Sequence, residues 1–223
     1  MQRFLNTLDT SNAALVKSLA AIQVRAKRRT DICDHLETLF LDTLGIRSRL
    51  IVELGSGDGE STFVLERIAK LWKAKLVSVD IEDRRNVSSY RDRLFVHRDD
   101  VAFAKEFEDW CRRHHLEPVI DILFIDTSHV FEHTVQEIHA WCPFLAPRCK
   151  VIFHDTNLKE IFVRKDGSAG RGWNNERGVI RAIEKHFSQS FDEAQDFMMT
   201  IGDWQIRHIA CCNGLMILDR YGE

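Results

Sequence analysis

The sequence predicts an α/β protein whose mostly parallel sheet carries helices on both faces. From residue 50 onward, short apolar runs alternate with longer amphipathic segments, and this rhythm is typical of a parallel sheet covered on both sides. Hydrophobic residues make up 44% of the chain and charged residues 29%, which excludes a wholly disordered or fibrous chain. Glycine is scarce, with 11 among 223 residues, yet seven of them fall within residues 55–59 and 167–178. These two glycine-rich stretches are the first places to look for function.

Two helices are expected before the first strand. Apolar residues recur at helical spacing over residues 12–29, with Ser11 as the N-cap, and again over residues 31–44. We assign residues 1–47 to an N-terminal helical extension and residues 48–223 to the main domain.

The main domain is expected to contain seven strands, of which the last two form an antiparallel hairpin turning at Cys212, Asn213 and Gly214. The polar segment 156–175 is expected to be a long loop. The expected strands cover residues 50–54, 75–80, 94–97, 119–126, 150–155, 204–211 and 214–220. The expected helices cover residues 60–71, 101–115, 130–142 and 176–187.

Charge and cysteine content point to a cytoplasmic protein. The net charge is −3, so the total favours no polyanionic partner. Six cysteines show no metal-knuckle spacing, the N-terminus lacks the apolar core of a signal peptide, and no run approaches the ~20 apolar residues of a membrane span. The basic N-terminal 30 residues are interpreted as a solvated helix end, with an anion or nucleic-acid contact as the alternative.

The first glycine-rich stretch predicts a ligand-binding turn. Glycines at positions 55, 57 and 59 follow the first strand and open a helix, so a ligand can lie close to the backbone beyond the strand ends. The spacing differs from that of a dinucleotide fold or a phosphate loop. The flanking residues Glu53, Asp58 and Glu60 are acidic and no basic residue is present. This setting repels a pyrophosphate and suits a ligand with a cationic centre.

Two acids after the next strands complete the predicted ligand site. Asp80 ends the second strand, where its carboxylate can accept hydrogen bonds from both ribose hydroxyls, and Asp99 follows the third strand, where it can receive an exocyclic amino group. Together with the glycine turn, these features resemble the class I S-adenosylmethionine (SAM)-dependent methyltransferases over roughly residues 48–220. The resemblance implies a Rossmann-like fold and SAM as cofactor. The cofactor-binding residues that it implies are Glu53, Gly55, Ser56, Gly57, Gly59, Asp80, Asp99 and Asp126.

Histidine and aspartate residues end two further strands. Asp126 and His129 follow the fourth strand, while His154 and Asp155 end the fifth, so all four should converge at the carboxyl edge beside the cofactor methyl group. Carboxylates and an imidazole suit Mg²⁺ or Mn²⁺. A bound cation lowers the pKa of a substrate hydroxyl, and an imidazole can accept its proton.

The D-x-x-H pattern followed by His-Asp resembles a narrower group, the metal-dependent small-molecule O-methyltransferases of the macrolide-sugar and cephalosporin-tailoring kind. The resemblance implies that Asp126, His154 and Asp155 bind Mg²⁺ and that His129 is the general base. These relatives commonly have Glu where this chain has His154. Because histidine brings less negative charge, a softer ion or no metal at all stays open.

The second glycine-rich stretch is cationic and aromatic. We expect it to form a lid over the acceptor, with Trp173 stacking on it and Arg171 or Arg177 pairing with an anionic group. A surface loop is the alternative. His133 and His139 are assigned to packing or surface positions.

The leading hypothesis is an enzyme that transfers a methyl group from SAM to a hydroxyl of a small molecule, with Asp126 and His129 as catalytic residues. Three alternatives stay open. These are metal-independent N-methylation of an amine or peptide side chain, a non-catalytic SAM-binding partner subunit, and a tRNA or rRNA methyltransferase using the basic N-terminal helix. The N-terminal helices serve either as a wall of the cleft or as a contact in a homo-oligomer.

Overall fold

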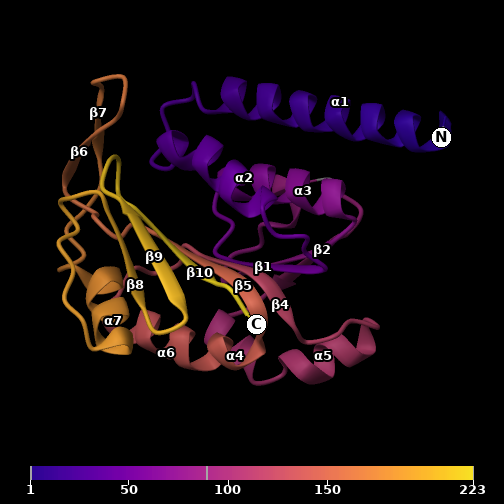
Figure 1. The fold of residues 1–223 in the computed structure, drawn as a ribbon. Coiled ribbons are helices and arrows are strands. Elements are labelled where there is room, and N and C mark those ends of the chain that lie inside the picture. The colour runs from indigo at the N-terminus through magenta and orange to yellow at the C-terminus, as the bar shows by residue number, and fades with distance from the viewer. Residues whose placement is uncertain (1, 89, 223) are drawn as a thin grey trace.

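The computed structural model describes residues 2–88 and 90–222, with side chains from residue 12 onward. It confirms an α/β fold of one large sheet between two helical layers (Figure 1). The strands of the large sheet are β1 (Leu50–Leu54), β2 (Lys75–Asp80), β3 (Arg93–His97), β4 (Ile120–Ile125), β5 (Leu145–His154), β8 (Phe197–Ile201), β9 (Trp204–Ile209) and β10 (Leu215–Arg220). The α-helices are α1 (Gln2–Arg25), α2 (Leu36–Leu44), α3 (Glu60–Trp72), α4 (Asp100–Ala104), α5 (Phe107–Arg113), α6 (Phe131–Trp141) and α7 (Gly178–Phe187). The short 3₁₀ segments are η1 (Cys33–His35), η2 (Arg85–Val87) and η3 (Cys142–Phe144).

The strand order is β3-β2-β1-β4-β5-β10-β9-β8. The first five strands are parallel, and β10, β9 and β8 follow in antiparallel pairs. The predicted hairpin of β9 and β10 is therefore present. The sheet has one strand more than the seven predicted, because β8 adds an edge strand whose Phe197 ring stacks on Phe191 at 5.5 Å.

Alternate side chains of each strand enter different cores, as expected for a strand buried on both faces. In β1, Val52 and Leu54 pack in the core beneath α4, α5, α6 and α7, whereas Ile51 packs in the core beneath α1, α2 and α3. Figure 1 shows the two helical layers on opposite faces of the sheet. This arrangement leaves the carboxyl ends of β1, β2, β3, β4 and β5 at one edge.

The N-terminal region differs from its prediction in its bounds. Helix α1 begins at Gln2 and ends at Arg25, so Ser11 lies inside the helix and is not its N-cap. Helix α1 contributes Ile22, and α2 contributes Leu39 and Phe40, to the core beneath α3. In the part of the chain that the structure describes, no helix is both long enough and apolar enough to cross a membrane.

Two predicted segments were wrong in detail. The helix expected at 101–115 is two helices, α4 and α5, because Glu106 leaves helical geometry with φ −111° and ψ 1°. The segment 156–175, expected to be a loop, contains an antiparallel hairpin of β6 (Ile161–Val163) and β7 (Ala169–Arg171). Only three residue pairs join these strands, too short a pattern to recognise in a polar sequence.

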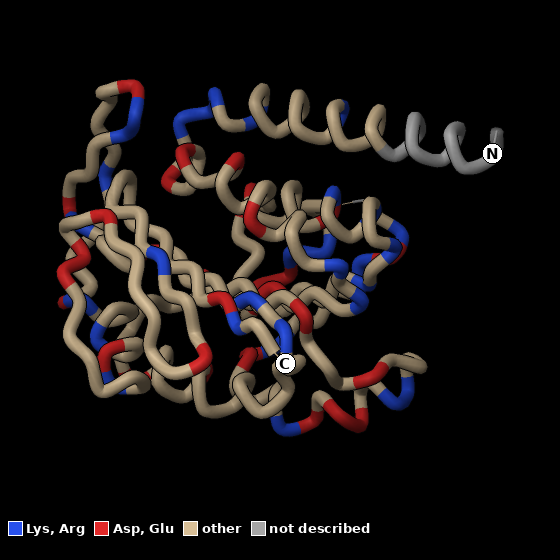
Figure 2. The backbone as a smooth tube through the Cα atoms, in the orientation of Figure 1, with Lys and Arg blue, Asp and Glu red and all other residues tan. Residues whose placement is uncertain are grey.

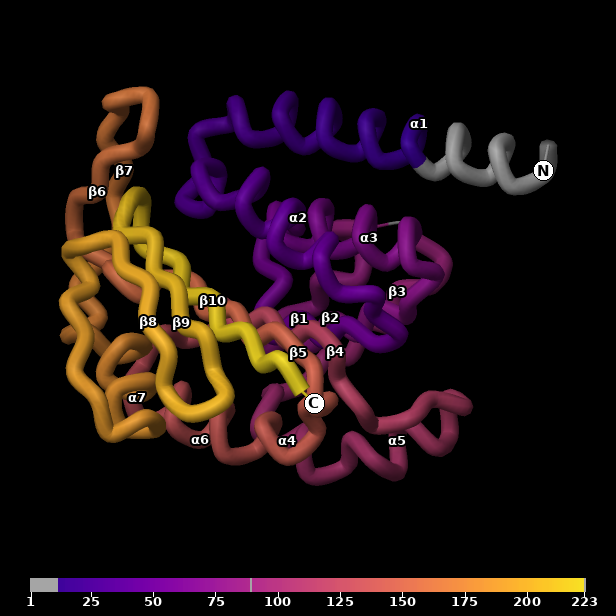
Figure 3. Tube along the Cα trace, in the orientation of Figure 1, coloured from indigo at the N-terminus to yellow at the C-terminus, as the bar shows by residue number. Residues whose placement is uncertain are grey.

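The β6–β7 hairpin is tied to the segment that follows α1. The Arg164 guanidinium donates to the carbonyl oxygens of Thr30 at 3.0 Å and Arg29 at 3.2 Å. The backbone N–H of Lys165 donates to the Asp34 carboxylate at 2.8 Å. In Figures 2 and 3 the hairpin rises beside this basic segment, above the sheet edge. Residues distant in sequence therefore form a wall on one side of the carboxyl edge.

Candidate active site

The glycine turn brings β1 close to the end of β4. Gly55 has φ +78°, and a Cβ atom added there would lie 1.9 Å from the carbonyl oxygen of Asp126. The backbone N–H of Asp126 in turn donates to the carbonyl oxygen of Leu54 at 2.9 Å. Only glycine allows this approach, because it combines a positive φ with the absence of a side chain. Gly55 therefore sets the distance between the turn and Asp126.

A cavity of about 440 Å³ opens beside this turn at the carboxyl edge of the sheet. Its lining includes Gly55, Gly57, Asp80, Asp99 and Asp126. Five of the eight residues proposed to bind the cofactor thus surround one cavity.

Glu53, Ser56 and Gly59 do not line this cavity. Glu53 is fully buried, and its carboxylate accepts hydrogen bonds from the hydroxyls of Ser61, Thr62 and Ser78 at 2.6 to 2.9 Å. Burial raises the pKa of Glu53, while these hydroxyls oppose that shift. The contacts join the end of β1 to the start of α3, so Glu53 supports the turn from beneath.

Asp80 and Asp99 both bond to nearby backbone. Asp80 accepts hydrogen bonds from the backbone N–H groups of Ser56 at 2.8 Å and Gly57 at 3.2 Å. Asp99 is the N-cap of α4 and accepts from the backbone N–H of Ala102 at 2.7 Å. Asp80 therefore holds the glycine turn in place at the cavity wall, and Asp99 holds the start of α4.

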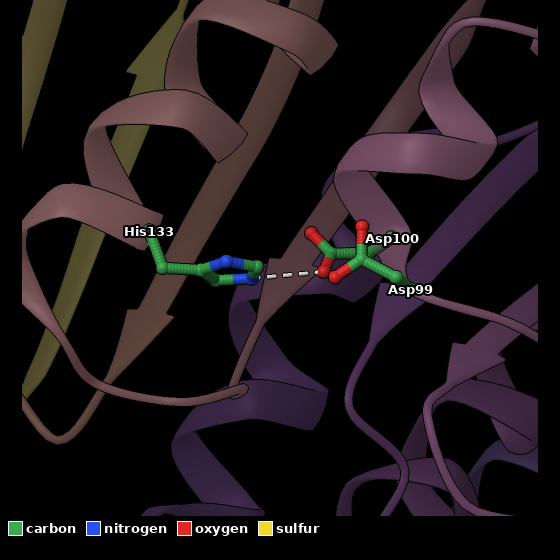
Figure 4. A group of neighbouring side chains, drawn as sticks. All are labelled: Asp99, Asp100 and His133. Carbon is green, nitrogen blue, oxygen red and sulfur yellow. Dashed lines mark hydrogen bonds and ion pairs between the residues drawn. The ribbon is translucent and has the colours of Figure 1, made fainter.

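A second group of acids lies at this cavity, and sequence analysis predicted only its member Asp99. Figure 4 shows His133 pointing toward Asp99 and Asp100, and its Nε2 lies 2.9 Å from Asp100 Oδ1. Glu137, fully buried, has Oε1 at 3.7 Å from the same nitrogen. We call Asp99, Asp100, His133 and Glu137 the acidic cluster. The i, i+4 spacing of His133 and Glu137 on α6 was the available signal, because such residues share a helix face.

The acidic cluster holds more carboxylates than cations. The hydrogen bond with Asp100 raises the pKa of His133 to about 9. Burial, reinforced by the charge of Asp100, raises the pKa of Glu137 to about 8. At neutral pH, His133 is therefore charged and Glu137 carries a proton.

The four residues predicted to converge do so. His129 Nε2 lies 3.0 Å from Asp126 Oδ1 and 3.0 Å from Asp155 Oδ2. His154 Nδ1 lies 3.3 Å from Asp126 Oδ1 and 3.3 Å from Asp155 Oδ1. We call this group the balanced cluster, because two carboxylates face two imidazoles. His129 and Asp155 both have φ +57°, a backbone strain that is common at functional sites.

Charge pairing dominates the protonation states of the balanced cluster. Burial alone would lower the pKa of His129, but its contacts with Asp126 and Asp155 raise it to about 10. Burial likewise opposes the charged form of His154, and the two carboxylates outweigh it and hold its pKa well above the usual value. The pKa of Asp155 lies far below its usual range because His154 and His129 outweigh the effect of burial.

The balanced cluster also has the donor atoms that a divalent cation requires. Ligand atoms of Asp126, His154 and Asp155 lie within 4.8 Å of one another. Asp155 Oδ1 is buried and has no hydrogen-bond partner. Two carboxylates and one imidazole suit Mn²⁺ and, less closely, Mg²⁺. The residues therefore fit a metal ion.

Residues 52–156 match a protein family described as a methyltransferase domain. The matched region covers 105 of the 223 residues. This match agrees with the resemblance to methyltransferases drawn from the glycine turn and the strand-end acids.

Solved structures share the fold of the methyltransferase domain. MycE from the mycinamycin biosynthetic pathway, in complex with Mg and SAH, is 16% identical, with a TM-score of 0.57 over 92% of this chain and 55% of that one. CalS11, a TDP-rhamnose 3′-O-methyltransferase of calicheamicin biosynthesis, is 13% identical, with a TM-score of 0.52 over 88% and 82%. Cofactor-bound Rv0187 from MTB is 14% identical, with a TM-score of 0.57 over 95% and 91%. The chain thus spans about half the length of MycE. No curated protein matches the sequence.

The N-terminal segment supplies two further residues to the methyltransferase site. His35 is fully buried, and its ring centroid lies 5.7 Å from that of His154. Burial lowers the pKa of His35 to about 3, and the charge of His154 adds to this effect. Burial also raises the pKa of Asp31, and the charges of Asp126 and Asp155 contribute. Sequence analysis missed both residues because they precede the strands that carry the motif.

The predicted lid residues separate into two groups. Trp173 is 46% exposed and its ring centroid lies 5.9 Å from that of His129, so it borders the balanced cluster. Arg177 is held by Glu193 at 2.6 Å and Glu184 at 3.0 Å and lines a separate cavity of about 460 Å³. Arg171 is exposed on β7. Neither arginine lines the cavity beside the glycine turn.

Proposed function

We propose that this methyltransferase domain transfers a methyl group from SAM to a hydroxyl of a small molecule, with divalent-metal assistance. The proposal rests on the location of Asp126, which belongs to two parts of the site at once. This residue lines the cavity beside the glycine turn and also belongs to the balanced cluster. A methyl donor in the cavity and an acceptor at the cluster would therefore meet at one residue.

SAM suits the cavity because of its charge. The acids of the lining outnumber its cations and so favour a cationic sulfonium: Asp80, Glu82, Asp99, Asp100 and Asp126 stand against Arg84, Arg98 and His133. The glycine turn leaves room for a ligand against the backbone. We propose that Gly55 and Gly57 lie beside the methionine part, Asp80 beside the ribose and Asp99 beside the adenine. Glu53, Ser56 and Gly59 would act by shaping the turn.

Asp126, His154 and Asp155 would hold the metal ion. When bound, a divalent cation at this position lowers the pKa of a coordinated hydroxyl. The fit of the donor atoms to Mn²⁺ or Mg²⁺ supports this part of the proposal.

His129 would act as the general base. Its Nε2 faces the carboxylates of Asp126 and Asp155. These carboxylates stabilise the protonated imidazole and raise the pKa of His129 to about 10. Once their charge is neutralised, the imidazole can be neutral near pH 7 and accept the hydroxyl proton. The acceptor oxygen then attacks the methyl carbon, and the electrons of the carbon–sulfur bond pass to sulfur.

The acceptor is proposed to be a small molecule that contacts Trp173. The half-exposed indole beside His129 offers a surface for stacking, and MycE was solved with mycinamycin VI. We also propose that residues 1–47 form an extension to the methyltransferase domain and that the protein is cytoplasmic, where its six free cysteines would stay reduced.

The test is calorimetry of the full chain with S-adenosylhomocysteine, with and without Mn²⁺ or Mg²⁺. We expect saturable binding of the cofactor product at one site per chain and binding of one metal ion. Asp80→Asn should lower the affinity for S-adenosylhomocysteine at least about tenfold, which is the effect of one charge-assisted hydrogen bond. It should leave metal binding intact. If the nucleoside does not bind under any condition, the proposal is overturned.

A metal-independent N-methyltransferase is the second candidate. It is favoured by the charge balance of Asp126, His129, His154 and Asp155, since two imidazoles already neutralise two carboxylates. Nucleoside binding without any metal binding would select this candidate over the first.

A further inference from the structure

The fully buried histidine of the N-terminal segment lies directly beside a proposed metal ligand. His35 ends η1, and its ring is perpendicular to that of His154, with an interplanar angle of 74° and a centroid separation of 5.7 Å. His154 is 1% exposed. Water therefore has little access to either ring, and each ring nitrogen must find its partner within the protein.

The hydrogen-bond pattern of His35 leaves one acceptor free. Its Nε2 lies 3.0 Å from the carbonyl oxygen of Cys211. Because a carbonyl only accepts, Nε2 carries the hydrogen. A neutral imidazole has one N–H, so Nδ1 of His35 has a lone pair. This Nδ1 is buried without a partner.

His154 presents the complementary vacancy. Its Nδ1 faces Asp126 and Asp155, each at 3.3 Å, whereas its Nε2 is buried without a partner. For Nδ1 to bind a metal ion its lone pair must be free, and the hydrogen must then sit on Nε2. That hydrogen needs an acceptor, and the adjacent ring of His35 offers one.

We propose that His35 is a positioning residue for the metal site. Its Nδ1 accepts the Nε2 hydrogen of His154 through one buried water molecule, and so keeps Nδ1 of His154 free toward Asp126 and Asp155. The inference rests on the metal use proposed above. Histidine ligands of metals commonly donate their second N–H to a fixed acceptor, which sets their tautomer and orientation.

The arrangement also sets two preferences for the tautomer of His154 against each other. The carboxylates of Asp126 and Asp155 favour a hydrogen on Nδ1 of His154, the nitrogen whose lone pair a metal ion would need. His35 favours the hydrogen on Nε2 instead.

The test compares His35→Phe, which removes the acceptor at similar volume, with His35→Gln, which keeps an acceptor oxygen. In calorimetry of the full chain with Mn²⁺, we expect His35→Phe to bind about 10- to 100-fold more weakly than wild type and His35→Gln to stay within about tenfold. Leu39→Val, a change in the same buried core without loss of a polar group, should leave the affinity unchanged.

A second measurement reads the tautomer directly. In ¹⁵N spectra of histidine-labelled protein with Mg²⁺, His154 should carry its hydrogen on Nε2 in wild type and His35→Gln. Equal Mn²⁺ affinity of wild type and His35→Phe overturns the role of His35 alone, as does an Nδ1-protonated His154 in the Mg²⁺-bound wild type. If the wild-type chain binds no metal, both this inference and the metal-dependent function are overturned. If His35→Phe does not fold, His35→Leu, which also removes the acceptor, takes its place in the same Mn²⁺ titration.

Discussion

The acidic cluster and the balanced cluster are built from the same residue types and neutralise their charge in opposite ways. In the balanced cluster, two imidazoles face two carboxylates, the pKa of His129 rises to about 10 and that of Asp155 falls far below its usual range. In the acidic cluster one imidazole faces three carboxylates. Burial and Asp100 therefore raise the pKa of Glu137 to about 8, and the excess charge is removed by a proton.

This difference assigns a different kind of ligand to each cluster. Carboxylates that stay ionised can bind a metal cation when the imidazoles beside them give up a proton. In the acidic cluster, Asp99 and Asp100 line the cavity and can accept hydrogen bonds, which suits the amino edge of a nucleobase. We therefore propose that the balanced cluster binds the metal ion and that the acidic cluster contacts the nucleoside. Asp126 lies where these two parts of the site adjoin.

The sharpest test of this separation is one substitution in each cluster. Asp155→Asn removes a proposed ligand, so Mn²⁺ affinity should fall by at least ~100-fold, beyond the effect of removing a group behind a ligand. Asp100→Asn should keep the Mn²⁺ affinity within about threefold of wild type. It should instead lower the affinity for S-adenosylhomocysteine. Calorimetry with each ligand gives the four affinities. Loss of Mn²⁺ binding in Asp100→Asn would reverse the assignment.

Gly55 lies against the backbone of Asp126 in the balanced cluster, and its substitution should produce the largest effect on stability. In Gly55→Ala the new Cβ would lie 1.9 Å from the carbonyl oxygen of Asp126, at φ +78°. We expect a loss of about 3 kcal/mol in the free energy of unfolding, from backbone strain and overpacking. Gly57→Ala is the control, since no atom lies within 4 Å of its Cβ and only its φ of +42° is strained. It should cost about 1 kcal/mol in urea denaturation.

The proton on Glu137 predicts a pH dependence of stability. Its pKa rises from 4.5 to about 8 on folding, so between these pH values the folded state holds a proton that the unfolded state releases. The free energy of unfolding therefore falls as pH rises through this window. Glu137→Gln removes the contribution, and its stability should fall less than that of wild type between pH 5 and pH 8. The two slopes should differ by more than about 1 kcal/mol over this range, and parallel slopes in urea denaturation would contradict a buried proton.

The smallest effect is expected for an exposed ion cluster, which shows what burial contributes to the other two. Arg177 pairs with Glu184 and Glu193 but is 45% exposed. Arg177→Ala should cost no more than about 1 kcal/mol, and Arg171→Ala should cost less than about 0.5 kcal/mol. Thermal denaturation measures both. A larger loss for Arg171 would reveal a contact that the exposed strand β7 does not show.

Much of the fold followed from local pattern. The apolar runs and glycine turn predicted β1, α3 and the parallel sheet because strand periodicity and positive φ are properties of short segments. The eighth strand was missed because it depends on packing with Phe191. The break before α5 and the β6–β7 hairpin were missed because each involves too few residues to leave a pattern in the sequence. Residues Asp126, His129, His154 and Asp155 were brought together as expected because parallel strands end at one edge.

The functional residues at the strand ends could be predicted from the sequence. A residue that ends a parallel strand must lie at the carboxyl edge of the sheet, whatever path the rest of the chain takes. The placement of Asp80, Asp99 and Asp126 around one cavity follows from that rule. Protonation did not follow from it. The proton on Glu137 and the neutral ring of His35 depend on burial and on partners far away in the chain, and only tertiary packing sets these.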